Sequence, residues 1–308
     1  DKYLFRFYVH DPWWMNSPWI DRYERQPHDI YLPLSVARVD ENGNIRKPDQ
    51  LNILTVDNSL GEMPDDCPNE VIPHILRAVS HAPDEVSPIV WVYPMDEYNE
   101  RAEKSVQSIK EMFFGDWFIR GAINNAFPLS SVISTDNFVS VLTKNSNFFN
   151  GSVIVTIPPV SGTKTYAALM DFIDRGGQVI LYGAVEDEKL RALLGLKRAE
   201  ELSGEFKVDL MLPSDTQLNG SAADTLIHRN LTSMGGLHDI MDYNKADNTV
   251  KTLAVARQGD KERVIAVHRV NDTGGGIVWV RGTCSCSYKK GQYLLQTDSP
   301  EKYFIGER

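Results

Sequence analysis

The sequence predicts an α/β fold: a doubly wound, mostly parallel sheet with an antiparallel extension. Between residues 88 and 187, short apolar segments rich in β-branched and aromatic residues alternate with longer segments whose apolar residues recur every three or four positions. From about residue 201, strand-like segments follow one another through glycine-containing turns. Alternating strands and helices build parallel sheets, whereas consecutive strands joined by turns build antiparallel ones.

The parallel part is predicted to contain strand and helix segments in alternation. The expected strands are short and apolar and lie at residues 87–94, 130–135, 152–157 and 178–182. The expected helices carry a broad apolar face and lie at residues 108–126 and 163–175. Gly176 and Gly177 give the second helix a stop signal directly before the last of these strands.

The antiparallel extension is predicted from four later segments, several of which alternate apolar with polar residues. They lie at residues 205–212, 249–256, 263–269 and 277–281. Their connections contain paired glycines or Asn-Gly and Gly-Asp steps, which favour turns. We therefore expect these strands on the edge of the parallel sheet.

The order of these elements and several local features match a known domain family. Acidic residues, Asp96 and Glu97, follow the first strand, Arg175 precedes the two glycines that leave the last helix, and residues 275–282 give a late closing strand. In this order the segment resembles the flavodoxin-like, glutamine-amidotransferase-like module known as the trimerisation domain of family 42 β-galactosidases. The resemblance implies a bacterial, glycoside-hydrolase-like protein in which this module acts as a scaffold or oligomerises.

The turn after the third strand lacks the nucleophile that an amidotransferase requires. Such an enzyme needs a cysteine at this turn, with a histidine and an acid downstream, because a thiolate must be activated by an oriented base. Pro158 and Pro159 occupy the turn, and Ser161 is the nearest hydroxyl. We therefore expect the module to be inactive as an amidotransferase, with Ser161 or Thr163 capping the next helix.

Length and charge narrow the class of protein. A chain of 308 residues suggests about two domains, predicted at residues 1–87 and 88–308, with a β-rich extension at 201–270. The net charge of -10 argues against nucleic acid or an anionic membrane surface as a partner. No apolar run approaches the roughly 20 residues that span a bilayer.

Cysteine usage gives expectations about cofactors and location. The three cysteines are too few for a disulfide framework, and Cys284 and Cys286 lack the companions of a zinc site. We expect reduced thiols, no metal and no cofactor. Reduced thiols favour the cytoplasm, but the chain begins at Asp1 without a methionine and reads as a segment of a longer protein. A signal peptide could be missing, and the localisation stays unknown.

A loop after the first strand carries an unusual concentration of aromatic and charged side chains. The strand is predicted at residues 2–9, and the loop contains His10, Asp11, Trp13, Trp14, Trp19, Asp21, Arg22 and Tyr23. Aromatic planes stack on the C–H faces of sugar rings, while charged groups bond the hydroxyl edges. We interpret these residues as a carbohydrate-binding surface. The alternative is an aromatic plug that packs the loop onto the core or a neighbouring subunit.

The rest of the first 87 residues resembles the end of a (β/α) barrel. Residues 29–39 and 51–56 flank an Asn42-Gly43 step that favours a hairpin, and residues 69–80 form an amphipathic helix. Strand, polar loop and helix are the unit of a barrel, but a whole barrel needs about 250 residues. Residues 1–87 can therefore form only the end of a (β/α) barrel.

Carboxylates near the ends of strands are the candidates for glycosidase chemistry. Asp57 and Glu62 follow the strand at 51–56, and Asp96 and Glu97 follow the strand at 87–94. A glycosidase needs one protonated carboxyl and one carboxylate, roughly 5 to 10 Å apart. Three of these acids also have a structural explanation: Asp57 can cap a turn, and Asp96 and Glu97 can sit in solvent at the sheet edge.

These observations predict part of a carbohydrate-active enzyme with an inactive amidotransferase-like module. The expected partners are a carbohydrate ligand and either further copies of the chain or the remainder of a longer parent chain. An alternative is a non-catalytic carbohydrate-binding or assembly module. A weaker alternative is a hydrolase that uses Ser161 or a cysteine, although Cys67 lies beside Asp65 and Asp66, which suppress a thiolate.

Overall fold

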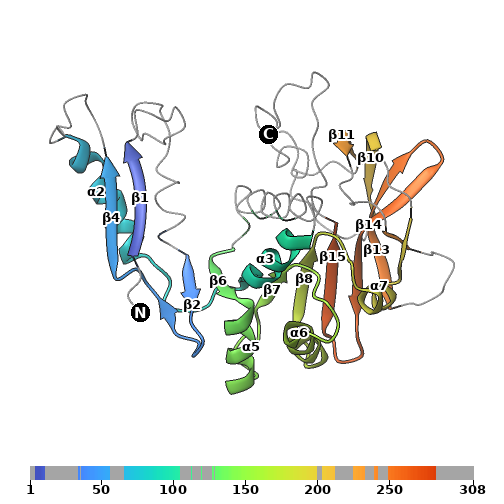
Figure 1. The fold of residues 1–308 in the computed structure, drawn as a ribbon, viewed down its shortest axis with the longest axis horizontal. Coiled ribbons are helices and arrows are strands. Elements are labelled where there is room, and N and C mark those ends of the chain that lie inside the picture. Colours follow the sequence, from blue (N-terminus) through green and yellow to red (C-terminus); the bar gives the residue numbers. More distant parts are fainter. Residues whose placement is uncertain are drawn as a thin grey trace.

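The computed structural model describes residues 4–10, 34, 36–55, 66–104, 112, 119, 127, 129–199, 203–211, 225–232, 239–241 and 249–281. Its main feature is a sheet of eleven strands (Figure 1). From one edge to the other they are β11 (Thr225–Thr232), β10 (Ser203–Leu210), β13 (Val250–Gln258), β14 (Lys261–Val270), β15 (Gly276–Val280), β8 (Gln178–Tyr182), β7 (Val153–Thr156), β5 (Ile89–Tyr93), β6 (Ser131–Ser134), β2 (Ala37–Val39) and β3 (Ile45–Arg46).

The sheet combines a parallel block with antiparallel strands. Neighbours are parallel from β15 through β8, β7, β5 and β6 to β2. Strands β11, β10, β13 and β14 continue the sheet beyond β15 in antiparallel fashion, and β3 closes the other edge. Within the block, β6-β5-β7-β8 is the spatial order second, first, third, fourth, which is the flavodoxin-like arrangement. The predicted fold class is confirmed.

The central strands are buried because both faces of the parallel block are covered. Val90, Ile154 and Val179 are almost inaccessible to solvent and belong to the main apolar core. Val155 and Tyr182 lie in a second core cluster. Burial on both faces explains why these strands are continuous apolar runs in the sequence and lack an alternating pattern.

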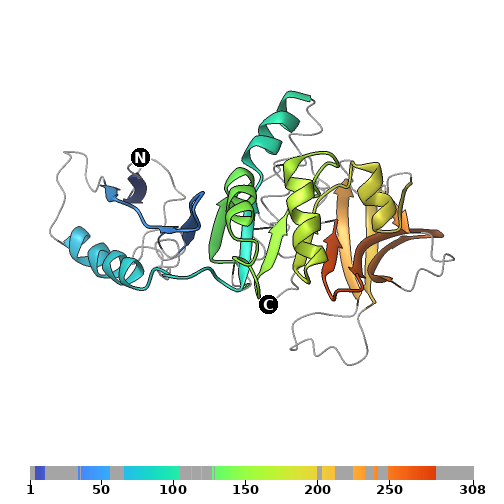
Figure 2. The ribbon, with the colours of Figure 1, turned by 90° about the horizontal axis from the view of Figure 1, so that it is seen from below.

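Three helices lie in a row along the sheet (Figures 1 and 2). They are α5 (Thr135–Lys144), α6 (Lys164–Asp174) and α7 (Glu188–Leu193). Each begins at a side chain that accepts a hydrogen bond from a backbone N–H of the first turn: Ser134, Thr163 and Asp187. Phe138 of α5 and Leu169 of α6 are fully buried and anchor these helices to the core.

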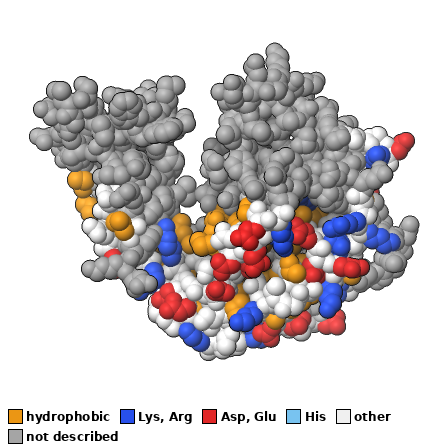
Figure 3. All heavy atoms as spheres, in the orientation of Figure 1, with side chains coloured by type: hydrophobic (Ala, Val, Ile, Leu, Met, Phe, Trp, Pro, Cys, Tyr) orange, Lys and Arg blue, Asp and Glu red, His pale blue; other side chains and the backbone are white. Residues whose placement is uncertain are grey.

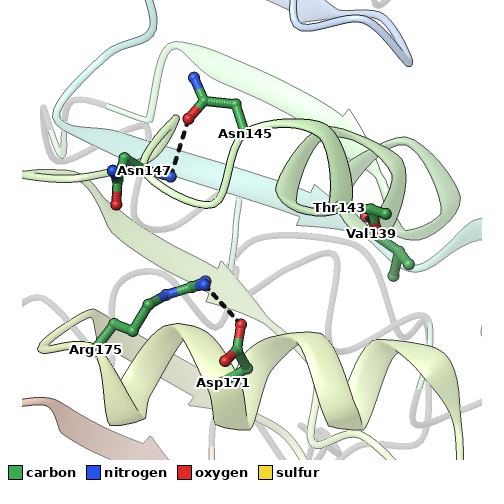
Figure 4. Close-up of polar contacts among 6 residues, drawn as sticks. All are labelled: Val139, Thr143, Asn145, Asn147, Asp171 and Arg175. Atoms are coloured by element: carbon green, nitrogen blue, oxygen red, sulfur yellow. Dashed lines mark hydrogen bonds and ion pairs between the residues drawn. The ribbon is translucent and has the colours of Figure 1, made fainter.

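Helix α6 ends where the sequence predicts. Arg175 is its C-cap and forms an ion pair with Asp171, Nη1 to Oδ2 at 2.8 Å (Figure 4). Gly176 then adopts a positive φ of 96°, a conformation that favours glycine. A Cβ atom on Gly177 would lie 2.6 Å from the carbonyl oxygen of Phe172. Both glycines are therefore needed to turn the chain into β8.

Strand β1 (Leu4–His10) and strand β4 (Gln50–Thr55) form a separate parallel pair, followed by helix α2 (Asp66–Ser80). The sequence instead suggested a hairpin between residues 29–39 and 51–56. The hairpin at this turn is the shorter pair β2 and β3, with Gly43 at a φ of 85°. Pro48 follows β3, and proline has no N–H with which to continue a ladder. The chain therefore leaves the hairpin before β4.

The apolar face of α2 is only partly covered. Ile75 and Ala78 are buried, as an amphipathic helix requires. Ile72 and Leu76 are 48% and 64% exposed, and Val79 is also exposed. Figure 3 shows apolar side chains on the surface in this part of the molecule. The helix thus has more apolar surface than the described elements cover.

Several elements differ from the sequence expectations. Helices α3 (Met95–Lys104), α5 and α7 were not predicted, and neither was the small sheet formed by β9 (Leu196–Arg198) and β12 (Asp239–Met241). The helix expected at 108–126 falls almost wholly outside the described residues. Strands β2 and β3 precede residue 87 yet belong to the main sheet.

In the described part of the chain, no helix is long and apolar enough to cross a membrane.

Candidate functional site

The parallel block opens between β5 and β7, the point at which the strand order reverses. The two strands last pair at Trp91 and Val155. One residue later, the Thr156 hydroxyl donates to the Val92 carbonyl oxygen at 2.9 Å, in the interior. After that the chains diverge, β5 into α3 and β7 into the turn before α6. In open α/β sheets, ligands bind in the crevice at this position, outside the carboxyl ends of the strands.

A cavity of about 140 Å³ lies at this crevice. Its walls come from one face of α3, the end of β7 and the turn after it, the first turns of α5 and α6, and the segment before α7. Its acidic lining residues are Glu97, Glu100 and Glu186, its basic ones are Arg101 and Lys104, and its hydroxyl groups come from Thr135, Thr156, Thr163 and Thr165. Buried proline and isoleucine side chains complete the wall. The cavity therefore combines an apolar wall with a few charged and hydroxyl groups.

Glu97 connects three helix starts at the cavity. Its Oε2 accepts a hydrogen bond from the Thr135 hydroxyl at 3.0 Å, and its Oε1 accepts one from the Thr165 hydroxyl at 3.2 Å. Thr135 begins α5, Thr165 lies in the first turn of α6, and Glu97 lies in the first turn of α3. A carboxylate is favoured there by the helix dipole. The position of Glu97 is thus held from two sides.

Arg101 is the buried cation of the cavity. Only 7% of it is exposed, and its Nη2 donates to the Pro158 carbonyl oxygen at 3.3 Å. Among the described residues, no carboxylate lies within ion-pair distance of its guanidinium. A buried charge whose partner in the described part of the chain is a neutral acceptor is stabilised when water or a ligand also contacts it. The other N–H groups of Arg101 can therefore donate to a ligand in this cavity.

Ser161, in the turn between β7 and α6, is held by Asp187, which lies between β8 and α7. The Ser161 backbone N–H and hydroxyl both donate to Asp187 Oδ2, at 2.9 and 2.6 Å. Asp187 Oδ1 accepts from the Leu190 backbone N–H at 2.8 Å and caps α7. Burial favours the neutral carboxyl, but these hydrogen bonds outweigh it and hold the pKa of Asp187 below its ordinary value. Burial and the Asp187 carboxylate together raise the pKa of Tyr166.

The structure places only part of the predicted site. Glu97 lines the cavity, whereas its neighbour Asp96 is exposed on the outside of the first turn of α3 and does not line it. His10 is the last residue of β1, and its side chain is outside the description. The other predicted site residues, Asp57, Glu62, Asp11, Trp13, Trp14, Trp19, Asp21, Arg22 and Tyr23, lie outside the described residues. The aromatic loop and the pairing of the carboxylates therefore stay predictions.

Sequence reasoning missed Arg101 and the two threonines that donate to Glu97, Thr135 and Thr165. Arg101 lies four residues after Glu97, a spacing that is typical of a solvated ion pair on a helix surface. Nothing in the sequence indicates that α3 turns this arginine inward. Among the described residues, no cluster of three or more His, Cys, Asp or Glu side chains is arranged to hold a metal ion.

Comparison with known proteins identifies the fold but no family. No protein-family model matches the sequence, and no curated protein matches it. Among solved structures, a β-galactosidase from Bacillus circulans sp. alkalophilus matches 77% of the chain with a TM-score of 0.51 at 11% identity. A β-galactosidase from Rahnella covers 77% of the chain with a TM-score of 0.43 at 11% identity, and a ThuA-like protein from Bacteroides uniformis covers 63% with a TM-score of 0.40 at 10% identity.

The chain spans 37% of the length of each β-galactosidase and 81% of the ThuA-like protein. The first match shows that the chain shares a fold with part of a β-galactosidase, as the resemblance in the sequence implied. At 11% identity it shows the fold alone.

Proposed function

We propose that this chain is part of a carbohydrate-active, glycoside-hydrolase-like enzyme, and that its doubly wound domain is a scaffold without amidotransferase chemistry. The observation that carries the proposal is the turn after β7. Two buried prolines, Pro158 and Pro159, fill the place where the resemblance requires a cysteine, and the cavity beside them has neither a cysteine nor a histidine among its described lining residues.

Ser161 does not replace the missing cysteine. A serine nucleophile needs a base that takes its proton during attack. The only partner of the Ser161 hydroxyl in the described chain is the carboxylate of Asp187, whose lowered pKa makes it a weak base. Both oxygens of Asp187 are also engaged in holding the turn and capping α7. The hydrogen bonds between Ser161 and Asp187 therefore fit a structural role for Ser161 better than a role as nucleophile.

The carbohydrate role of the chain is the second half of the proposal. It is supported by the aromatic and charged composition of residues 10–23 and by the name of the β-galactosidase that shares the fold. Asp57, Glu62, Asp96 and Glu97 remain the proposed catalytic carboxylates. Besides the carbohydrate, the proposed partners are further copies of this chain in a homo-oligomer, or the remainder of a longer parent chain.

Two assays of the purified chain test the proposal. The first measures ammonia release from L-glutamine, and we expect none. The second measures cleavage of aryl β-glycosides by the wild type and by Asp57→Asn, Glu62→Gln, Asp96→Asn and Glu97→Gln. Loss of a catalytic carboxylate should lower the rate by at least about a hundredfold. The matched control is Asp272→Asn, an exposed carboxylate in the turn before β15.

The outcomes separate the two halves of the proposal. Ammonia release would contradict the scaffold role of the doubly wound domain. Four fully active carboxylate variants would refute the catalytic assignments. An absence of cleavage, together with sugar binding that is lost in Trp13→Ala or Trp14→Ala, would favour the alternative of a non-catalytic carbohydrate-binding module.

A further inference from the structure

We propose that the cavity between β5 and β7 binds one neutral sugar ring. This inference deepens the proposed carbohydrate role and rests on it, but it uses residues other than those of the aromatic loop. Three properties of the cavity carry it: its size, its separated donors and acceptors, and its apolar wall.

The size of the cavity selects a single ring. Its volume is about 140 Å³. An engineered protein cavity of about 150 Å³ takes up one benzene molecule, which is one six-membered ring. Pockets for drug-sized ligands start at about 300 Å³. A hexose has about twice as many non-hydrogen atoms as benzene, so its ring can enter the cavity while some of its hydroxyl groups stay at the open mouth, whereas most of a disaccharide would lie outside.

The polar groups of the cavity require a ligand that both donates and accepts hydrogen bonds. Arg101 offers N–H donors beyond the one that reaches Pro158, and Glu97 offers acceptor capacity beyond its two threonine contacts. These two side chains lie four residues apart on α3 but do not form an ion pair. Adjacent hydroxyl groups on a sugar ring can accept from the guanidinium and donate to the carboxylate at once.

The charges around the cavity disfavour an ionic ligand. An anion attracted to Arg101 would also meet Glu97, Glu100 and Glu186, and a cation would meet Arg101 and Lys104. Like charges near the ligand oppose its binding; the effect is strongest for Arg101, which is buried, and weaker for the exposed Glu100, Glu186 and Lys104, which water screens. A neutral ligand avoids both penalties.

The remaining wall suits the C–H face of a ring. Pro94, Ile157, Pro158 and Pro159 are all buried and line the cavity. They form an apolar surface beside the polar groups, and this combination is typical of small-molecule sites. Packing on such a surface removes the C–H groups of the sugar from water while its hydroxyls face α3.

Isothermal titration of the whole chain with D-galactose, D-glucose and D-mannose tests the site. We expect at least one of the three to bind. Arg101→Met and Glu97→Gln should weaken that binding at least about tenfold, because each removes a hydrogen bond to a charged group. The control Glu103→Gln, an exposed carboxylate of α3 outside the cavity, should bind like the wild type. Thermal melts establish that each variant is folded.

A second variant keeps the test decisive if Arg101→Met does not fold. Val160 lines the cavity and is 44% exposed, so Val160→Trp can fill the mouth without disturbing the core. Binding should be lost in this variant. Binding of L-glutamine or inorganic phosphate in place of a sugar would overturn the inference, as would unchanged sugar binding in the cavity variants.

The titration also separates this inference from the proposed function. If the cavity variants bind sugar normally and Trp13→Ala with Trp14→Ala abolishes binding, the cavity is not the site but the carbohydrate role stands. If no sugar binds and no glycoside is cleaved, both fail.

Discussion

At the residue scale, Asp187 determines the shape of the turn that follows β7. One of its oxygens accepts two hydrogen bonds from Ser161, and the other accepts the backbone N–H of Leu190. The turn and the start of α7 are therefore held by a single carboxylate. An aspartate before a helix is a typical cap in a sequence. The sequence does not reveal that Ser161, 26 positions away, donates to the same Asp187 carboxylate.

Replacing Asp187 with alanine should lower the free energy of unfolding by about 1 to 2 kcal/mol at pH 7, because a helix cap and a charged acceptor are lost. The pKa of Asp187 is lowered in the folded protein. Its stabilisation is therefore fully present above the unfolded pKa of about 3.9 and is lost as the pH falls through the lower folded pKa. Urea unfolding at pH 7, 5 and 3 measures the difference between wild type and variant.

We expect that difference to be equal at pH 7 and pH 5 and smaller at pH 3. Glu103→Ala, which removes an exposed carboxylate of α3, is the control and should change stability by less than about 0.5 kcal/mol. A difference that grows toward acid would show that the carboxylate is not the stabilising form.

At the element scale, the turn before β15 packs directly against the end of α6. The Asn271 side chain donates to the Ile173 carbonyl oxygen at 3.1 Å, and a Cβ atom on Gly275 would lie 1.8 Å from the same oxygen. Such an approach is possible only for glycine. The contact joins two elements that are about a hundred residues apart in the sequence.

Gly275→Ala should therefore lower the free energy of unfolding by about 1 to 3 kcal/mol, because α6 and β15 would have to move apart. Asp272→Ala, in the same turn and exposed, is the matched control and should have little effect. Urea unfolding at pH 7 compares the two. An equal effect of both substitutions would mean that the turn adapts to a side chain at Gly275.

Elements were predicted from the sequence where burial leaves a strong pattern. Strands β5, β7 and β8 and helix α6 lie close to their predicted positions because continuous apolar runs and the two glycines after α6 identify them. Helix α3 was missed because most of its residues are charged. Helix α5 was missed although Ser134 caps it and Phe138, Val141 and Leu142 form its buried face.

At the scale of the whole molecule, local and distant pairings meet in one sheet. The units from β5 to β8 are consecutive in the chain, whereas β15 pairs with β8 across nearly a hundred residues. The sequence predicted β10, β13, β14 and β15 but neither β11 nor the order in which the strands pair, since hydrophobic periodicity indicates a strand and not its neighbour. The cavity could not be predicted from the sequence for the same reason. Its lining residues come from several elements that come together only in the folded sheet.

Amide hydrogen exchange should follow this arrangement. We expect the slowest exchange in β7 and β8, which pair on both sides inside the parallel block, and faster exchange in β3, which is at the edge of the sheet. Mass spectrometry of peptides that contain residues 153–156, 178–182 and 45–46 measures the exchange rates of the three strands and checks their predicted order. Equal protection of β3 and β8 would contradict it.

The late arrival of β15 has a consequence during synthesis. Until the ribosome has made residues 276–280, β8 has no neighbour on that side, and its apolar run Gln178–Tyr182 is an open edge. At a typical translation rate of about 5 to 20 residues per second, this edge of β8 stays unpaired for at least several seconds. Open apolar edges attract other chains. Slowed translation between residues 182 and 276 should thus increase aggregation of the nascent protein, and a chaperone that shields β8 should reduce it.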